Sequence, residues 1–323
     1  MEVDIEFLRT HRPLARPIPQ QAVLNLAKFG QWAGAATPRR VEGFKTFEYP
    51  VIFATNHTHV LDFLPLWIEV LKAGQQMVGW VKARMYKQRL NRVLMRTIGS
   101  NIPLVSKGYL IAADFRRLMG CPPTSDEYRH LRDHIDYCHR LPAGRPYERI
   151  QSTPRDMLGR KFDPKQSSYR EAMVDLFFEM MKVCLDHART CSEQGYHMHI
   201  YPEGAVSKRM GPGHTGIIHA ALALNLPIVP VGISGTREAF AGNTPLTWGG
   251  EFRLRFGERF DVNRSLVSEG FRPFHPDDQI QCDEAFQEVT DRLMQRLNEL
   301  LDEDYKCRSG YQVDGPQGVK RFY

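Results

Sequence analysis

Short apolar runs rich in β-forming residues alternate along this chain with longer segments of helical periodicity. Such runs predict buried strands, and they lie at residues 50–55, 76–81, 102–105, 198–202 and 226–234, with an alternating outer strand at 251–260. Apolar residues spaced three or four apart predict helices, at residues 64–74, 84–98, 169–191, 214–225 and 283–303. The alternation of strands and helices favours an α/β sandwich.

The order of these elements divides the chain into three parts. Residues 1–40 form an arm and an amphipathic helix at 19–33, which either caps the domain or lies on a membrane surface. Residues 41–265 form the main domain, and residues 266–323 add a C-terminal helix and tail. Residues 108–169 are rich in Arg, His, Pro and Tyr and lack strand periodicity, so we expect an insertion that is partly helix and partly loop.

Composition places the chain among folded globular proteins. Its 323 residues are 42% hydrophobic and 25% charged, which is enough to bury a full core. No run approaches the roughly 18 to 20 apolar residues that a membrane-spanning helix needs, so we expect a soluble chain or one attached peripherally. The net charge of +6 favours an anionic partner: nucleic acid, lipid headgroups, a phosphorylated substrate or an acidic carrier protein.

The cysteines and the N-terminal residues predict a location. The first residues carry charges where a signal peptide has an apolar core. Free thiols in a reducing cytosol are therefore expected, with the protein cytoplasmic or peripheral on the inner face of the membrane. The six cysteines are scattered without a CxxC pair, at Cys121, Cys138, Cys184, Cys191, Cys282 and Cys307.

A histidine and an aspartate follow the first buried run. His57 comes two residues after the strand predicted at 50–55, and Asp62 lies five residues later. When such a turn folds back, the carboxylate accepts the Nδ1 proton and leaves Nε2 free to take a proton from a hydroxyl. This is the base-and-orienter half of a serine-type triad, with the hydroxyl supplied by a substrate. The same spacing also suits a structural histidine at a helix start.

Metal binding is another alternative for this segment. His57, His59 and Asp62 resemble the HxHxDH run of metallo-β-lactamase-type hydrolases, yet the aspartate falls one residue late and Phe63 follows it instead of a histidine. The alternating histidine pair of the later strand, His197 and His199, need not converge on this site. Ligand spacing therefore argues against a metal, and we expect none.

A second polar loop follows the strand predicted at 198–202. Glu203 can accept hydrogen bonds from substrate hydroxyls, Gly204 permits a tight turn or a close backbone approach, and Lys208 and Arg209 can neutralise an anion. A loop with a solvated carboxylate is the alternative. Because both loops follow strand ends, we expect them at the same edge of the sheet.

Four motifs in one order resemble the glycerolipid acyltransferase family, which includes glycerol-3-phosphate and lysophosphatidic acid acyltransferases. The NHxxxxD block is Asn56 to Asp62, and a block with a glycine, a short strand and a basic residue is Gly99 to Lys107. The PEG block is Tyr201 to Ser207, and an apolar strand with an internal proline is Ile228 to Val231. The resemblance covers residues 41 to 260, and its first and third blocks are the most specific.

This resemblance implies an αβα sandwich with a mixed central sheet. It also implies an O-acyltransferase that moves a fatty acyl group from acyl-CoA or acyl carrier protein to a hydroxyl of a glycerol-phosphate-type or other lipid acceptor. By the resemblance, His57 is the general base, Asp62 orients it, and no metal or organic cofactor takes part. The residues implied in substrate binding are Asn56, Lys107, Glu203, Gly204, Ser207 and Lys208.

Two departures from the family pattern affect the acceptor half of the site. Lys107 stands where the family commonly has an arginine, and Val206 replaces the arginine of the third block. A lysine supplies charge without the bidentate fork that suits phosphate. The motifs therefore support acyl transfer more firmly than a phosphate-bearing acceptor. A hydrolase that uses the same His–Asp pair and a non-catalytic lipid-binding relative are the alternatives.

Two predicted helices carry features with more than one meaning. The segment 169–191 bears a Met and Phe stripe, which forms either core or an acyl-chain groove. The segment 81–96 carries six Lys and Arg residues, which form either a solvated face or a docking surface for lipid headgroups, acyl-CoA phosphates or acidic carrier protein. Nucleic acid is disfavoured as a partner, because no recognised binding module accompanies the charge.

Overall fold

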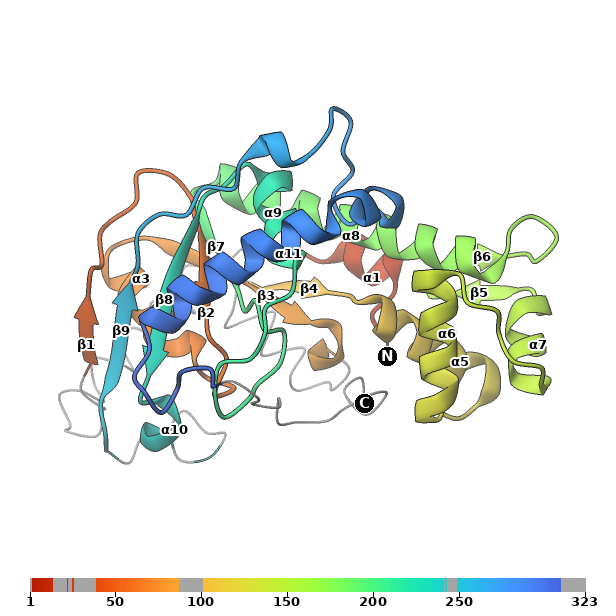
Figure 1. Ribbon diagram of the computed structural model, residues 1–323, viewed down its shortest axis with the longest axis horizontal. Helices are drawn as coiled ribbons and strands as arrows, with labels where there is room; N and C mark the ends of the chain where they lie inside the picture. Colours follow the sequence, from red (N-terminus) through yellow and green to blue (C-terminus); the bar gives the residue numbers. More distant parts are fainter. Residues whose placement is uncertain are drawn as a thin grey trace.

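A mixed β-sheet organises the part of the chain that the computed structural model describes: residues 2–13, 39–86, 101–240 and 249–308, with residues 22, 25 and 242. Seven strands stand in the order β1-β9-β8-β2-β7-β3-β4 (Figure 1). The strands β8, β2, β7, β3 and β4 run parallel to one another. β9 is antiparallel to β8 and parallel to β1. Their bounds are β1 (Arg39–Glu42), β2 (Ile52–Thr55), β3 (Gln76–Lys82), β4 (Asn101–Leu104), β7 (Tyr196–Ile200), β8 (Ile228–Ser234) and β9 (Phe252–Phe256).

The strands form where the apolar runs predict them. Every residue of β2 and of β8 is buried, as expected for parallel strands that are covered on both faces. β9 alternates buried and half-buried residues. All six predicted strands are confirmed, with ends that differ by up to four residues.

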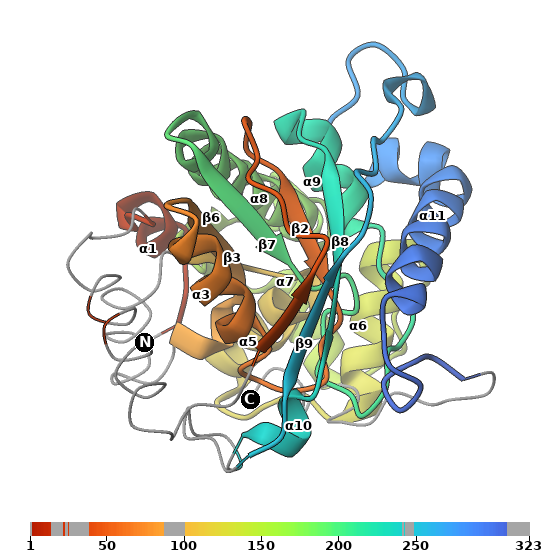
Figure 2. The ribbon, with the colours of Figure 1, turned by 90° about the vertical axis from the view of Figure 1, so that its left-hand side faces the viewer.

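Helices cover both faces of the sheet, which confirms the αβα sandwich (Figure 2). On one face, α3 packs on the strands through an apolar cluster that includes Leu66 of the helix and Phe53 and Val231 of the sheet. On the other face lie α8, α9 and α11, and α1 packs on α8. The bounds of these helices are α1 (Ile5–Thr10), α3 (Phe63–Lys72), α8 (Tyr169–Glu193), α9 (Gly216–Leu224) and α11 (Pro276–Glu299).

The Met and Phe stripe of the long helix belongs to the core. α8 begins with a reciprocal capping box between Ser168 and Glu171, which satisfies two backbone donors at the helix start. The helix then packs on β4, β7, α5 and α9. The core alternative is confirmed, because every member of the stripe is buried: Met173, Leu176, Phe177, Met180, Met181, Cys184 and Leu185.

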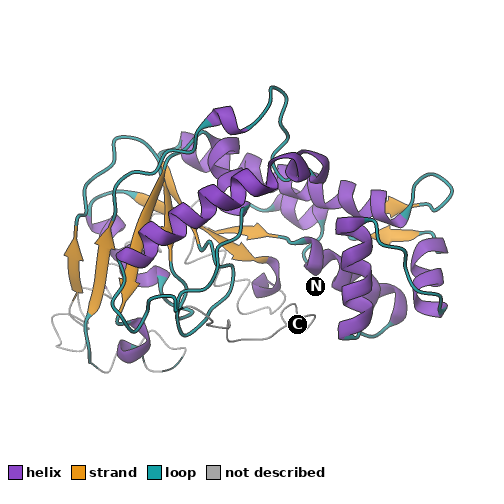
Figure 3. Cartoon of the chain, viewed as in Figure 1, coloured by secondary structure: helices purple, strands orange, loops and turns teal. Residues whose placement is uncertain are grey.

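The insertion contains more regular structure than its sequence predicts. Three helices are followed by an antiparallel hairpin, β5 and β6 (Figure 3). The hairpin turn is Leu158–Gly159, and both residues have positive φ, 54° and 94°, as the favoured two-residue hairpin turns require. Strands of three residues are too short to show alternation, so the prediction missed them. The bounds are α5 (Lys107–Met119), α6 (Ser125–Tyr137), α7 (Arg145–Ser152), β5 (Arg155–Met157) and β6 (Arg160–Phe162).

The C-terminal helix is part of the main core. Periodicity predicts it over 283–303, and α11 covers Pro276–Glu299. Its apolar stripe packs on α9 and β8, with Phe286, Leu293 and Leu297 fully buried.

Two predicted helices, at 19–33 and 84–98, lie outside the described residues apart from a few positions, as does most of the cationic segment 81–96. The remaining short elements are α10 (Thr236–Ala239) and 3₁₀ turns at Ala83–Tyr86 and Arg264–Leu266. In the part of the chain that the structure describes, no helix is long and apolar enough to cross a membrane. The six cysteines are free thiols.

A buried ion pair joins two elements of the insertion. The Arg155 guanidinium at the start of β5 donates to both Asp114 carboxylate oxygens of α5, at 2.8 and 2.6 Å. The two side chains are only 9% and 0% exposed. Arg155 also packs on the rings of Phe162 and Tyr169. A bidentate pair of this kind fixes both position and angle.

Replacing Arg155 by Met is expected to lower the free energy of unfolding by about 3 to 5 kcal/mol, because it leaves the Asp114 charge buried without its partner. Arg129→Met is the matched control, since its pair with Asp126 is 58% and 75% exposed and is expected to change stability by under about 1 kcal/mol. Urea unfolding of both variants measures the difference. Equal effects of the two substitutions would contradict the role of the buried pair.

Candidate active site

The loops that follow β2, β7 and β8 meet at one edge of the sheet. β2 lies between β7 and β8, and the three strands run parallel, so their carboxyl ends share that edge. After β2 the chain crosses to β3, which lies toward the β4 edge of the sheet. After β7 it crosses to β8, which lies toward the β1 edge. Crevices at the carboxyl ends of strands, where the chain changes direction in this way, are where open α/β sheets bind ligands.

Asn56 fastens the end of β2 to β8. Its side-chain amide donates to the Ile233 carbonyl at 2.9 Å, and its Oδ1 accepts from the Ile233 N–H at 2.8 Å. The side chain is fully buried. Although the motif implies substrate binding for Asn56, its contacts in the structure set the point where the next turn begins.

His57 directs one ring nitrogen toward Asp62. Nδ1 is buried and lies 3.5 Å from Asp62 Oδ2, and the imidazole is 16% exposed. The opposite nitrogen, Nε2, is therefore the one through which the ring can reach a substrate. The imidazole lies flat on the Tyr201 ring, with centroids 3.7 Å apart and planes 15° from parallel. The turn folds back as the five-residue spacing predicts.

Asp62 is a fully buried carboxylate with three hydrogen-bond donors. Oδ2 accepts from the backbone N–H groups of Thr58 at 2.6 Å and His59 at 2.7 Å. Oδ1 accepts from the hydroxyl of Thr236 at 2.5 Å. These donors replace the water that a buried charge loses.

Glu203 joins the two loops through the backbone. Its Oε1 accepts from the His57 N–H at 2.7 Å, and its Oε2 accepts from the Gly211 N–H at 2.7 Å and from the Ser207 hydroxyl at 3.3 Å. The side chain is 5% exposed, so the alternative of a solvated carboxylate is wrong. Burial raises the pKa of Glu203 to about 7, although the two backbone donors act in the opposite direction.

The other residues of the PEG loop surround this carboxylate. Gly204 has φ +63°, which confirms the predicted tight turn. Ser207 is buried, and its N–H donates to the His57 carbonyl at 2.9 Å. Its hydroxyl has a single proton, which the Arg209 carbonyl and Glu203 Oε2 share. Lys208 is exposed.

Lys107 lies apart from this cluster. It begins α5 after β4, and β7 and β3 stand between β4 and β2 in the sheet. Its ammonium pairs with Asp136 of α6 and lies 6.0 Å from the centre of the Phe177 ring. The structure thus gathers His57, Asp62 and the PEG loop at one place, and it connects Lys107 to the insertion.

Three histidines have structural partners: His59 and His199 near the site, and His197 at the opposite end of β7, where its Nδ1 accepts from the Val51 N–H at 3.1 Å. His59 Nδ1 accepts from the Leu61 N–H at 3.2 Å, while its Nε2 bonds the Gly242 carbonyl at 2.8 Å. Burial lowers the pKa of His197 to about 4 and that of His199 to about 3. Within the described ranges, no group of three or more His, Cys, Asp or Glu side chains is arranged to hold a metal ion.

Two residues of the site went unnoticed in the sequence. Thr236 bonds Asp62 across 174 positions of the chain, and no local pattern reveals such a contact. Tyr201 stands in the PEG block, directly before Pro202, but its motif assigns it no role. Its aromatic ring beside a predicted strand end was the available signal.

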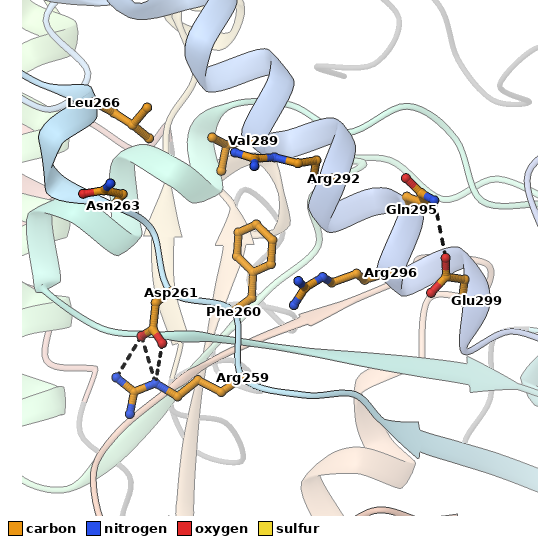
Figure 4. A pocket seen from close by; sticks show the side chains of 10 residues that line it. All are labelled: Arg259, Phe260, Asp261, Asn263, Leu266, Val289, Arg292, Gln295, Arg296 and Glu299. Carbon is orange, nitrogen blue, oxygen red and sulfur yellow. Dashed lines mark hydrogen bonds and ion pairs between the residues drawn. The ribbon is translucent and has the colours of Figure 1, made fainter.

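A cavity of about 590 Å³ lies away from these residues (Figure 4). It is lined by the segment after β9 and by α11, with Arg259, Arg292 and Arg296 among its side chains. Phe260, also in its lining, pairs with Ile228 at the start of β8, whereas the candidate active site lies at the ends of the parallel strands. The cavity is not part of that site.

Residues 177–234 match the family model described as Acyltransferase. The match covers part of the chain, and that part is similar to the acyltransferase family. The match confirms the resemblance to the glycerolipid acyltransferases that the motifs predict, and it spans the PEG loop and the proline-containing strand β8. The block from Asn56 to Asp62 lies before the matched segment.

Among solved structures, the chain is similar to the 1-acyl-sn-glycerophosphate (LPA) acyltransferase PlsC from Thermotoga maritima. The two are 13% identical, the alignment covers 84% of this chain and 77% of that chain, and the TM-score is 0.38. No curated protein matches the sequence.

The raised pKa of Glu203 predicts a pH-dependent stability. Between the ordinary value of 4.5 and the folded value of about 7, the folded protein holds a proton that the unfolded chain has lost. Stability from this group is therefore fully present below about pH 4.5 and falls as the pH rises toward about 7.

In Glu203→Gln this dependence disappears. Between about pH 5 and about pH 8, we expect the wild type to lose about 3 kcal/mol of unfolding free energy relative to Glu203→Gln. Urea unfolding at several pH values measures the difference. Glu284→Gln on the exposed side of α11 is the matched control, for which the difference stays flat. A flat difference for Glu203→Gln as well would show that Glu203 titrates normally.

Proposed function

We propose that this protein is an acyltransferase that moves a fatty acyl group from a thioester donor to a hydroxyl of a lipid acceptor, with His57 as general base and Asp62 as its orienting partner. One observation carries the proposal: at the carboxyl edge of the sheet, His57 Nδ1 faces the buried Asp62 carboxylate at 3.5 Å. A hydroxyl nucleophile needs a base that is neutral near physiological pH, and an imidazole supplies it.

The transfer is an addition followed by an elimination at the thioester carbonyl. His57 Nε2 takes the hydroxyl proton while the acceptor oxygen forms a C–O bond to the carbonyl carbon. The tetrahedral intermediate then collapses, the C–S bond breaks, and the imidazolium gives its proton to the leaving thiolate. Asp62 stabilises the imidazolium between the two steps, and the reaction as written consumes no further reactant.

The donor in this proposal is acyl-CoA or an acylated carrier protein. Both are anionic, in keeping with the net charge of +6. In this proposal the protein acts in the cytoplasm, bound peripherally to the inner face of the membrane, where a lipid acceptor is accessible.

Three cations around the site are engaged by protein groups and one, Lys208, is exposed. This balance favours an acceptor with little negative charge. The Lys107 ammonium is paired with Asp136. The Arg209 guanidinium donates to the Glu303 carbonyl at 2.8 Å. Arg237 donates to a backbone carbonyl at 2.7 Å and pairs with the carboxylate of the next residue. Cations that are already engaged inside the protein gain less from a substrate phosphate.

Replacing His57 by Ala is expected to lower kcat by at least about a hundredfold, because the hydroxyl then loses its base. The measurement is free-thiol release from a long-chain acyl-CoA, with and without a lysolipid or monoacylglycerol acceptor. The control is His139→Ala, an exposed histidine of the insertion, which leaves the rate unchanged. A folded His57→Ala protein with near-normal turnover removes His57 as the base, and equal thiol release without acceptor indicates hydrolysis instead of transfer.

The charge of the acceptor is tested by comparing monoacylglycerol with lysophosphatidic acid. We expect the wild type to have the higher kcat/KM for the neutral acceptor. Val206→Arg, which supplies a guanidinium in the PEG loop, should shift the ratio about tenfold or more toward the phosphate, while Val206→Gln leaves it unchanged. A wild-type preference for lysophosphatidic acid that Val206→Arg does not alter would sink this part of the proposal.

A further inference from the structure

Tyr201 covers one face of the His57 imidazole. The ring centroids are 3.7 Å apart and the planes differ by 15°, so the rings overlap face to face. An aromatic face attracts a cation more strongly than a neutral ring. The contact therefore stabilises the imidazolium form of His57 relative to the neutral imidazole, and it also fixes the plane of the ring.

The contact between Asp62 and the His57 imidazole is longer than a hydrogen bond. Oδ2, the oxygen nearest to His57, already accepts two backbone N–H groups at 2.6 and 2.7 Å. A carboxylate oxygen has two lone pairs, and His57 Nδ1 at 3.5 Å stands beyond the usual range of an N–H···O bond. The charge of Asp62 turns Nδ1 toward the carboxylate through space, but a contact of this length does not by itself fix the plane of the ring.

We propose that Tyr201 is a positioning residue for His57: its ring face fixes the imidazole plane and stabilises the protonated imidazole. Its effect on turnover rests on the proposed acyltransferase function. Its effect on the imidazole does not, and the two are measured separately.

Tyr201 is itself held rigidly. His199 packs edge-on against its ring, with centroids 4.5 Å apart and an interplanar angle of 74°. A hydrogen bond of 2.8 Å joins His199 Nε2 to the Thr55 hydroxyl at the end of β2. The Tyr201 carbonyl accepts from the Gly204 N–H at 3.0 Å. The stacked ring is thus supported from the strand, from a second ring and from the turn that follows.

The groups around His57 are Asp62, Glu203, Tyr201 and His199. Asp62 is the buried carboxylate beside Nδ1, and the backbone N–H of His57 is bonded to Glu203. Burial, with Asp62 and Glu203 nearby, raises the pKa of the Tyr201 phenol well above its usual value, so the phenol stays neutral. Burial lowers the pKa of His199 to about 3, so that ring stays neutral too. The imidazolium therefore stacks on a neutral aromatic ring, that of Tyr201.

The test is an NMR titration of the His57 ring in Tyr201→Leu and Tyr201→Phe, beside the wild type. Phenylalanine keeps the aromatic face and leucine removes it. We expect the His57 pKa to fall by about 0.5 unit or more in Tyr201→Leu and by less than about 0.2 in Tyr201→Phe. Tyr169→Leu, which removes a buried tyrosine from α8, is the matched control and leaves the His57 pKa unchanged. Tyr201→Met replaces the leucine variant if that variant does not fold.

Turnover gives the second readout. Tyr201→Leu should lower kcat about tenfold, with KM unchanged and the acid limb of the pH profile moved to lower pH, and Tyr201→Phe should restore both. An unchanged His57 pKa in Tyr201→Leu overturns the proposal. So does a Tyr201→Phe variant that loses as much as the leucine variant, because the hydroxyl and not the ring face then acts. A lowered pKa in a protein without transfer activity supports the stacking role and refutes the proposed function.

Discussion

Glu203 accepts hydrogen bonds from two loops that follow different strands. One oxygen takes the backbone N–H of His57 after β2, and the other takes the N–H of Gly211 in the long loop after β7. The Ser207 N–H closes the connection by donating back to the His57 carbonyl. With both its N–H and its carbonyl bonded, the peptide backbone of His57 has no freedom to turn. The position of the proposed base therefore depends on a carboxylate that is fully occupied by protein donors.

Asp62 and Glu203 are buried carboxylates that interact electrostatically, and this interaction has an energetic cost. Asp62 and Glu203 each lose their water, and each regains three hydrogen-bond donors, from N–H and hydroxyl groups. The charge of Asp62 adds to burial in raising the pKa of Glu203, because like charges disfavour each other's ionisation. A proton on Glu203 relieves this repulsion. The Asp62 charge is thus kept for the imidazole beside it, and Glu203 keeps its structural contacts.

The sequence predicts those parts of the molecule that depend on near neighbours. The buried strands follow from apolar runs, and the approach of Asp62 to His57 follows from their five-residue spacing. The partners of Glu203 could not be predicted, because His57 lies 146 positions away and the sequence does not record the register between β2 and β7. The same distance effect hides the bond from Thr236 to Asp62. The hairpin of the insertion was missed for the opposite reason, since three-residue strands carry too little pattern.

Lys107 shows how a motif residue can acquire a different partner. An arginine has five N–H donors in a planar fork, so it can bind an internal carboxylate with one edge and a phosphate with another. A lysine has one compact ammonium, and here it is paired with Asp136, which lies on α6 of the insertion. The ammonium is only 24% exposed and packs near the Phe177 ring. The insertion and the lysine therefore belong together physically, because the helix that carries Asp136 pairs with the Lys107 charge.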